Sequence, residues 1–236
     1  MMTKGAWIST AVCAVLLSAG CGGSTSDTKA TSADPAPSTT RDQLVLSGAE
    51  FPADTKPLDL PPDKLRTSVS DLGDAMAKST VTPADCKQPQ VDLAALSNDL
   101  ISNSSLAAAT TEDMTVYVEF VANKVADTRT MAAANEKCAA LTSASTVNGQ
   151  HIDTVVKMEH LPTPDTLSGI DTLAYRATST STISDTTPRT RTSYQGWATL
   201  RGMTVGVRAA ALSGTPDQAT FEKLFTDAVE KVRTAK

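Results

Sequence analysis

Apolar and polar residues alternate along three stretches in the last third of the chain: Leu173–Ile183, Thr190–Leu200 and Met203–Leu212. A period of two is typical of β-strands that bury one face, so these stretches are predicted to be strands. Arg201-Gly202 fits the two-residue turn of a hairpin and would pair Leu200 with Met203. That register gathers apolar residues on one face of the hairpin, namely Tyr194, Gly196, Ala198, Leu200, Met203, Val205, Val207 and Ala209.

The last segment of the chain has the spacing of an amphipathic helix. Its apolar residues recur at intervals that bring them onto one helix face: Phe221, Leu224, Phe225, Ala228, Val229 and Val232. Thr215 is the expected N-cap and Pro216 the expected first helical residue. The single apolar stripe predicts that this helix packs on the apolar face of the hairpin.

The earlier part of the chain contains both periodicities. Helices are predicted over Leu65–Ala77, Thr82–Ile101 and Asp127–Leu141, and strands over Met114–Val121 and Ile152–Met158. Together these elements predict an α+β fold, in which an antiparallel β-sheet has helices packed on one face. Aromatic residues make up 4% of the chain and hydrophobic residues 40%, so the core is expected to be aliphatic.

The N-terminus has the pattern of a secretory signal peptide, predicted over residues 1–20. Lys4 precedes the uncharged apolar stretch Ala6–Ala19, which is shorter than the roughly 20 residues of a membrane-spanning helix. The stretch runs into the sequence LSAGC, which ends at Cys21 and looks like a lipobox, the site where a cysteine is acylated. Cys21 is therefore the expected lipidation site. The alternative is an ordinary signal peptide followed by an incidental cysteine.

Residues 21–41 are predicted to be a lipidated, disordered linker, because they consist almost entirely of small and polar residues. This segment fits a plain flexible tether, and its Ser, Thr and Pro content also fits an O-glycosylation substrate. Residues 42–236 are expected to form a single α+β domain. Acyl chains would hold the protein at the outer face of the cell membrane without help from basic residues.

Cys86 and Cys138 are the cysteines that remain once Cys13 leaves with the signal peptide and Cys21 takes lipid. An even pair in an exported protein favours a disulfide, because the compartments outside the cytoplasm are oxidising. The two histidines do not lie at metal-ligand spacing from these cysteines, so no metal site is predicted.

Three short stretches resemble one protein family when they are taken together. They are LVLSGAEFP at 44–52, VTPADC at 81–86, and the segment 129–138 with the C-terminal helix Pro216–Arg233. The combination resembles mycobacterial lipoproteins of unknown function, distantly similar to the extracellular sensor domain of PknH-type receptor serine/threonine kinases. The resemblance covers most of residues 42–236. It implies a sensor-like domain with an antiparallel sheet, flanking helices and a cleft.

Composition and motifs exclude several classes of function. A net charge of −5 and a pI near 5.0 argue against a nucleic-acid partner, which needs a concentrated basic surface. The two histidines lie outside any G-x-S-x-G or S-x-x-K motif, and no phosphate-binding glycine loop is present. The sequence therefore predicts neither enzyme activity nor a cofactor.

The second face of the predicted hairpin carries the polar character of the domain. Trp197, Gln195 and Arg208 share this face, and Arg191 lies further along the same strand. If the preceding hairpin pairs Leu173 with Leu200, Arg176 lies beside Trp197. A tryptophan flanked by arginines on an open sheet face fits an anionic or sugar-bearing envelope molecule. The structural alternative is that Trp197 covers a bare glycine and the arginines solvate the face.

Two functions follow from these patterns. The first is an exported, membrane-anchored lipoprotein that acts as a non-catalytic binding or sensor-like module of the cell envelope. Its partner would be an envelope protein or a small envelope molecule. The alternative is a lipid or glycolipid carrier, which would need a large apolar cavity. Few large apolar residues remain once the core is filled, which favours the binding module.

Overall fold

The computed structural model describes residues 34–147, 149–184, 186–212 and 214–236, which belong to one compact unit. The predicted signal peptide and Cys21 lie outside these ranges. Within them, no helix has both the length and the apolar character needed to cross a membrane. The described residues form an α+β fold on a nine-stranded antiparallel sheet, which confirms the predicted fold class.

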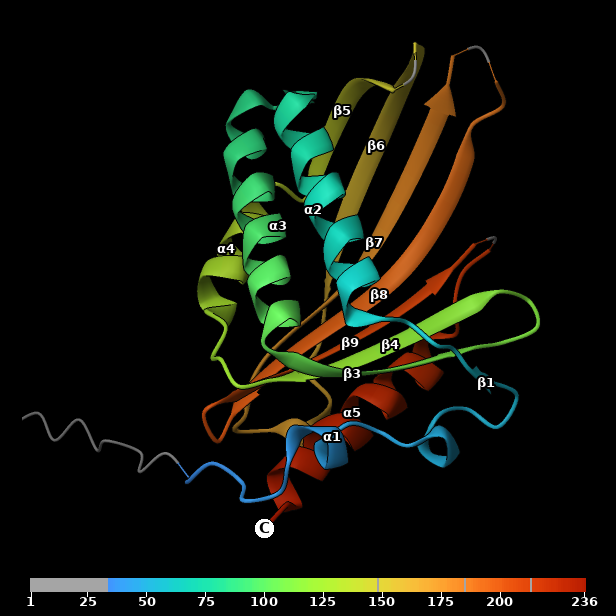
Figure 1. The fold of residues 1–236 in the computed structure, drawn as a ribbon. Helices are drawn as coiled ribbons and strands as arrows, with labels where there is room; N and C mark the ends of the chain where they lie inside the picture. Colours follow the sequence, from blue (N-terminus) through green and yellow to red (C-terminus); the bar gives the residue numbers. More distant parts are fainter. Residues whose placement is uncertain (1–33, 148, 185, 213) are drawn as a thin grey trace, which may run out of the picture. The chain divides into compact units, whose positions relative to one another are not determined.

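The strands lie in the order β1-β3-β4-β9-β8-β7-β6-β5-β2, and each neighbouring pair is antiparallel (Figure 1). The long strands occupy the centre of the sheet, and the two shortest form its edges. Their bounds are β1 Lys56–Pro57, β2 Thr80–Thr82, β3 Ser104–Thr110, β4 Thr115–Ala122, β5 Ala140–Val147, β6 Gln150–Leu161, β7 Asp171–Ile183, β8 Arg189–Leu200 and β9 Met203–Ala211.

Helices cover both faces of this sheet, so the prediction that they pack on one face is wrong. Figure 1 shows α2, α3 and α4 on one side of the strands and α5 with the short α1 on the other. The helices are α1 Arg41–Leu44, α2 Pro62–Lys78, α3 Lys87–Ser102, α4 Thr128–Lys137 and α5 Gln218–Thr234. Short 3-10 turns lie at Gly48–Glu50, Ala84–Cys86 and Asp165–Leu167.

The α5 helix packs on β8 and β9, as predicted. The register of these strands is the one that the Arg201-Gly202 turn requires, with Leu200 opposite Met203. Both turn residues have positive φ, 50° and 73°, which suits a two-residue hairpin loop. The apolar stripe of α5 is buried along its whole length: Phe221, Leu224, Phe225, Ala228, Val229 and Val232. Gly196 permits this approach, because a Cβ there would lie 2.9 Å from the Phe225 ring.

The start of α5 differs from the prediction by a few residues. The helix begins at Gln218, and the Asp217 carboxylate accepts a hydrogen bond from the Thr220 backbone N–H at 2.7 Å. Thr215 is therefore not the N-cap, and its hydroxyl instead lies 3.3 Å from that of Thr192 on β8. A carboxylate at this position satisfies the free N–H groups of the helix and complements its dipole.

A second core lies on the opposite face, under α3 and α4. Its buried side chains are Leu100, Phe120, Ala122, Ala126, Met131, Leu173 and Trp197. The Phe120 ring lies over Gly206, where a Cβ would come within 2.2 Å of it. The same ring meets Trp197 edge to face, with centroids 5.5 Å apart. Phe120, rather than Trp197, thus covers the bare glycine.

Several elements were not predicted from the sequence, namely the strands β1, β2, β3 and β5. The strands β3 and β5 consist mainly of Ala, Ser and Thr, which give little hydrophobic alternation. The predicted helix Thr82–Ile101 begins only at Lys87, after the β2 strand and a 3-10 turn. The predicted helix Asp127–Leu141 ends at Lys137, because the chain enters β5 at Ala140.

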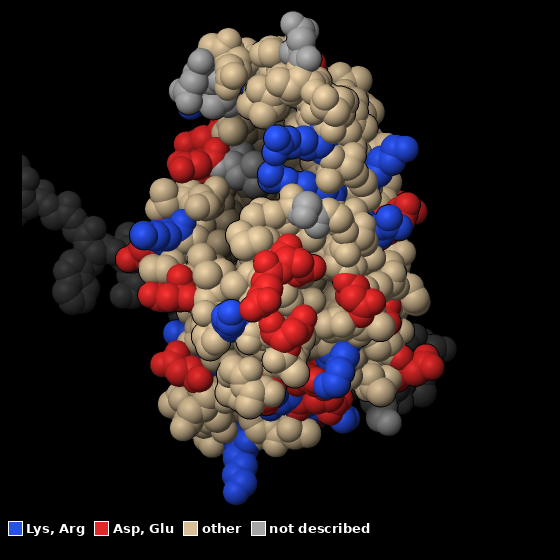
Figure 2. Space-filling view, turned by 90° about the vertical axis from the view of Figure 1, so that its right-hand side faces the viewer, with Lys and Arg blue, Asp and Glu red and all other residues tan. Residues whose placement is uncertain are grey.

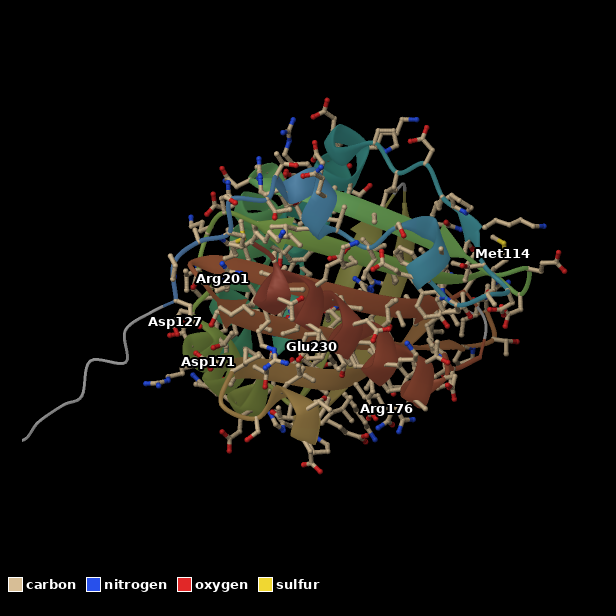
Figure 3. The ribbon with its side chains drawn as sticks, turned by 90° about the horizontal axis from the view of Figure 1, so that it is seen from below. Met114, Asp127, Asp171, Arg176, Arg201 and Glu230 are labelled. Atoms are coloured by element: carbon tan, nitrogen blue, oxygen red, sulfur yellow. A yellow bond between two sulfur atoms is a disulfide. The ribbon has the colours of Figure 1, made fainter. Side chains whose placement is uncertain are left out.

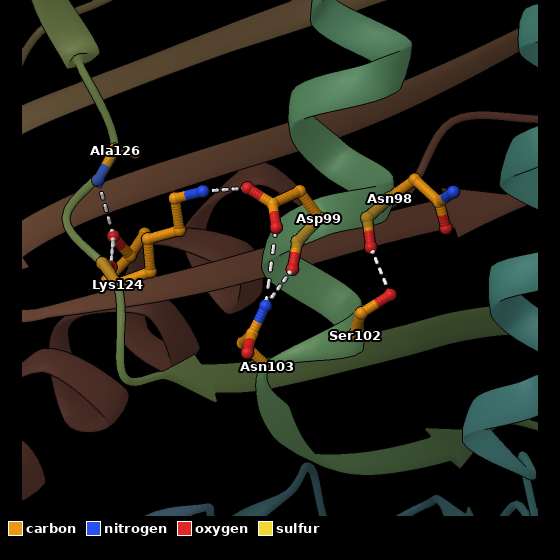
Figure 4. A network of polar contacts seen from close by, with 7 residues as sticks. Asn98, Asp99, Ser102, Asn103, Lys124 and Ala126 are labelled. Atoms are coloured by element: carbon orange, nitrogen blue, oxygen red, sulfur yellow. Dashed lines mark hydrogen bonds and ion pairs between the residues drawn. The ribbon is translucent and has the colours of Figure 1, made fainter. Parts of the chain in front are cut away.

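Helix α3 is fixed at both ends. A disulfide between Cys86 and Cys138 joins its start to the end of α4, with Cα atoms 5.6 Å apart, and confirms the predicted pairing. At its other end, Asp99 forms an ion pair with Lys124 in the segment after β4 (Figure 4). The hydroxyl of Thr204 on β9 donates to the Lys124 carbonyl and holds that segment against the sheet.

The first described residues are tied to the C-terminus. The N–H groups of Ser38 and Thr39 donate to the Lys236 carbonyl at 2.6 and 3.2 Å. The Arg201 side chain, near the end of α5 in Figure 3, donates to the carbonyls of Pro35 at 2.8 Å and Val232 at 3.1 Å. Pro35, Ser38 and Thr39 belong to the segment 21–41 that was predicted to be the linker, before the domain expected from residue 42. The linker residues 21–33 lie outside the described ranges.

Candidate functional site

A cleft of about 300 Å³ lies between the helices α2 and α3 and the second face of the sheet, and is called here the α2–α3 cleft. This volume is at the lower end of the range for small-molecule sites, roughly 300–1,000 Å³. The lining residues come from α2, α3, α4 and five strands: Leu65, Val69, Met76, Gln90, Leu93, Ala94, Ser97, Ile101, Val118, Phe120, Asn135, Met158, Tyr175, Gln195, Gly196, Trp197, Gly206, Val207 and Arg208.

The wall formed by α2 is apolar and incompletely covered. Leu65, Val69 and Met76 share one face of the helix and line the cleft. Among its described side chains, α2 has none that is fully buried. Gly73 allows α2 to approach α3, since a Cβ there would lie 3.3 Å from the Ala94 Cβ. Helix α2 therefore packs on α3 and turns its apolar face toward the cleft rather than against the sheet.

The floor of the cleft follows from the strand register. Arg208 of β9 lies opposite Gln195 of β8, which lies opposite Tyr175 of β7. Paired positions on adjacent strands share a face, so these three side chains form one polar row. Trp197 lies two residues along β8 and points to the same face. The Tyr175 hydroxyl donates to Gln195 Oε1, which orients both side chains.

Three buried N–H donors in the cleft have no acceptor among the described residues: Trp197 Nε1, Asn135 Nδ2 and Gln90 Nε2. Trp197 is 7% exposed and Asn135 8%. Both N–H groups lie near the Tyr175 oxygen and act to lower the pKa of that hydroxyl, but neither forms a hydrogen bond with it. A buried donor without an acceptor is unfavourable by roughly 1–3 kcal/mol. A ligand that supplies acceptors here would recover that free energy.

Arg208 places a positive charge in the cleft. Its side chain reaches solvent, yet desolvation by the surrounding protein lowers its pKa, a combination expected inside a cleft. In the described part of the chain, Tyr175 is the one ionisable group that shifts the Arg208 pKa. Burial raises the pKa of Tyr175, so its hydroxyl stays neutral and does not balance the charge. The guanidinium itself remains protonated near neutral pH.

The structure brings together three of the five side chains in the predicted binding face. Trp197, Gln195 and Arg208 meet in the α2–α3 cleft. Arg191 lies on the same face of β8, but it is exposed near the start of the strand and does not line the cleft. The face itself is not open, because α2 and α3 lie over it.

Arg176 lies on the other face, so its predicted place beside Trp197 is wrong. It is on the α5 side of the sheet (Figure 3) and forms an ion pair with Glu159 at 3.4 Å. The prediction depended on pairing Leu173 with Leu200, whereas Leu173 lies opposite Trp197. A shift of the register by three residues turns each side chain to the opposite face.

Sequence reasoning missed Tyr175, Asn135 and Gln90. Tyr175 has the same strand parity as Leu173, so the correct β7–β8 register would have placed it beside Gln195. Asn135 follows the buried Met131 by four residues on α4. A polar residue on the apolar stripe of a helix was the available signal. Gln90 carried no comparable signal, because the predicted helix around it has little amphipathic pattern.

Other hollows offer less to a ligand. A groove of about 710 Å³ runs beside α5, and there Lys231 pairs with Glu50 at 2.7 Å, so its charges are balanced within the protein. A hollow of about 400 Å³ adjoins the α2–α3 cleft and shares Asn135, Met158 and Tyr175 with it.

On the surface seen in Figure 2, acidic and basic side chains lie in small separate groups. No set of three or more His, Cys, Asp or Glu in the described ranges is placed to hold a metal ion.

Comparison with known proteins gives little further information. No family model matches the chain, and no curated protein matches it. Among solved structures, the X-ray structure of an uncharacterised Mycobacterium smegmatis protein, the Rv0999 ortholog, is similar. Its TM-score is 0.43 at 14% sequence identity, over 83% of this chain and 97% of that chain.

Proposed function

We propose that this chain is an exported, lipid-anchored lipoprotein that binds a small molecule of the cell envelope without converting it. The observation that carries the binding role is the pair of buried donors, Trp197 and Asn135, that line the α2–α3 cleft without acceptors among the described residues. Ligand sites are typically concave and mostly apolar, with a few placed polar groups. The α2–α3 cleft has this composition, with Arg208, Tyr175 and Gln195 on its floor.

The residues that line the cleft support binding rather than catalysis. None of the described lining residues is His, Asp, Glu, Lys or Cys. The Ser97 hydroxyl is a poor nucleophile here, because it donates to the Leu93 carbonyl at 2.8 Å. Acid–base and nucleophilic catalysis need a tunable group beside the reacting atom.

Export and anchoring rest on the N-terminal sequence. The apolar stretch before LSAGC supports a signal peptide, and Cys21 supports acylation at the outer face of the cell membrane. The Cys86–Cys138 disulfide agrees with export, since such bonds persist in oxidising compartments. The resemblance to mycobacterial lipoproteins points to the same location.

A lipid or glycolipid carrier is the second candidate function. The apolar side chains that α2 and α3 turn toward the cleft favour it, among them Leu65, Val69 and Leu93. A volume of about 300 Å³ suits a small ligand or one acyl chain better than a glycolipid with several chains. The size of the cleft thus favours the binding module.

Native mass spectrometry tests the binding role. The chain purified from an envelope-bearing host should carry a non-covalent ligand, and Leu93→Trp should remove it by filling the cleft. Ala95→Trp is the matched control, because Ala95 is an exposed residue of the same helix. Both variants should keep the thermal midpoint of the parent within a few degrees. A ligand retained in a folded Leu93→Trp variant, or no ligand in any form, would contradict the proposal.

A further inference from the structure

We propose that the α2–α3 cleft takes a single-chain anionic amphiphile. Its carboxylate or phosphate group meets Arg208 and the N–H groups of Trp197 and Asn135, and its apolar chain lies against α2 and α3. This inference rests on the proposed function and names the class of ligand for the same cleft.

The sign of the ligand charge follows from the polar atoms of the cleft. The buried unpaired atoms that line it are all donors, on Trp197, Asn135 and Gln90. Arg208 adds a full positive charge, and no described carboxylate lines the cleft to balance it. Donors that line the same cleft as a guanidinium favour an anion, because charge-assisted hydrogen bonds are roughly twice as strong as neutral ones.

The remaining polar groups do not change this preference. The Tyr175 hydroxyl donates its proton to Gln195 Oε1. This amide oxygen, the strongest acceptor of the pair, is therefore already occupied within the protein. A cationic ligand would meet Arg208 at close range, where like charges repel. The cleft is therefore built for an acceptor-rich, negatively charged group.

The apolar part of the ligand follows from the walls. Leu65, Val69 and Met76 of α2 face the cleft, and each of them is only half-buried by the protein itself. Covering them with an acyl chain would bury apolar surface at about 25 cal/mol per Å². The volume of about 300 Å³ limits the occupant to one chain. A polar end and one apolar chain together describe an anionic amphiphile.

Trp197 makes the test direct, because Trp7 and Trp197 are the only tryptophans of the chain. The full chain with Trp7→Phe and Cys21→Ala has one tryptophan, in the cleft, and can be studied without detergent. We would titrate it with dodecanoate and dodecyl phosphate below their micelle concentrations and follow Trp197 fluorescence. Dodecanol, dodecyltrimethylammonium, acetate and inorganic phosphate are the comparison ligands.

The expected result is saturable binding of dodecanoate and dodecyl phosphate, about tenfold tighter or more than that of the other four compounds. Arg208→Gln should lower the affinity for dodecanoate to that for dodecanol, and leave dodecanol binding and the thermal midpoint unchanged. Arg176→Gln is the matched control, since Arg176 lies on the opposite face and pairs with Glu159. It should bind dodecanoate like the parent.

The other outcomes separate this inference from the proposed function. Equal binding of dodecanol and dodecanoate would overturn the anionic preference and leave a binding cleft. Acetate or phosphate that binds as tightly as its dodecyl counterpart would overturn the role of the chain. Absence of binding by all six probes would overturn the ligand class, while a co-purified ligand that Leu93→Trp removes would keep the proposed function. An Arg208→Gln variant that unfolds would show that the arginine is structural.

Discussion

Glu119 is a carboxyl group placed in the core between the sheet and α5. It is fully buried on β4, and its Oε2 accepts a hydrogen bond from the Leu46 N–H at 2.9 Å. Burial raises its pKa to about 8, although that hydrogen bond and the charge of Lys231 oppose the shift. Strand parity alone puts Glu119 on the face of Tyr117 and Val121. From its residue type alone, Glu119 would be expected at the surface, since carboxylates are rarely buried without a partner.

The raised pKa of Glu119 predicts a pH-dependent stability. Because the folded state holds this proton more tightly than the unfolded chain, the contribution to the free energy of unfolding is complete below the unfolded pKa near 4.5. It is lost as the pH rises toward about 8, at roughly 1.4 kcal/mol per pH unit. Glu119→Gln should flatten this fall and be more stable than the parent at alkaline pH.

Urea unfolding of the parent and Glu119→Gln at about pH 5 and about pH 8.5 would measure the effect. Glu136→Gln is the control, because Glu136 is exposed on α4 and should keep the profile of the parent. A parent whose stability rises between these two pH values would show that Glu119 is ionised in the folded protein.

Helices and strands were predictable from the sequence where a short turn or a regular apolar pattern determined them. The β8–β9 hairpin and α5 followed from a two-residue turn and an uninterrupted apolar stripe. The β7–β8 register did not, because the connection between Ile183 and Arg189 is too long to determine pairing. The incorrect register placed Arg176 on the wrong face of the sheet, and it gave no indication that Tyr175 lies beside Gln195. The Ala- and Ser-rich strands β3 and β5 were missed because small residues give no clear period.

The disulfide should stabilise the position of α3 over the cleft. Cys86 and Cys138 are 52 residues apart, so the bond restricts a long loop of the unfolded chain. The chain-entropy relation gives roughly 4 kcal/mol for a loop of this length. The double variant Cys86→Ala/Cys138→Ala should therefore lose up to about this much free energy of unfolding, and cleavage by protease should begin near the start of α3.

Thermal unfolding and limited proteolysis would test this prediction on the oxidised parent, the reduced parent and the double variant. The reduced parent and the double variant should have the same thermal midpoint and the same cleavage pattern. If the intact mass of the oxidised protein did not rise by two hydrogen atoms on reduction, the bond would not have formed.

At the scale of the molecule, the candidate site is assembled from distant parts of the chain. Helices α2 and α3 belong to the first half of the described residues, α4 lies at its end, and the floor strands β7, β8 and β9 belong to the second half. The sequence could predict that Trp197, Gln195 and Arg208 share a face, because one hairpin sets that relation. It could not predict that a helix pair lies over them, because no short connection links α2 and α3 to β8. The burial of Trp197 is therefore a property of the whole fold.

The proposed anchoring also concerns the whole molecule, and it rests on Cys21. Each buried methylene of an acyl chain contributes about 0.8 kcal/mol, so two or more chains would hold the protein stably at a membrane. Cys21→Ala should move the protein from the membrane fraction to the soluble fraction and leave Trp197 fluorescence unchanged, because residue 21 is remote in sequence from every residue that lines the cleft. Cys13→Ala is the matched control, since Cys13 lies within the apolar stretch and should be removed with it. Detergent-phase partitioning measures the change, and a Cys21→Ala protein that stays in the detergent phase with the Cys13→Ala control would rule out a lipid anchor at Cys21.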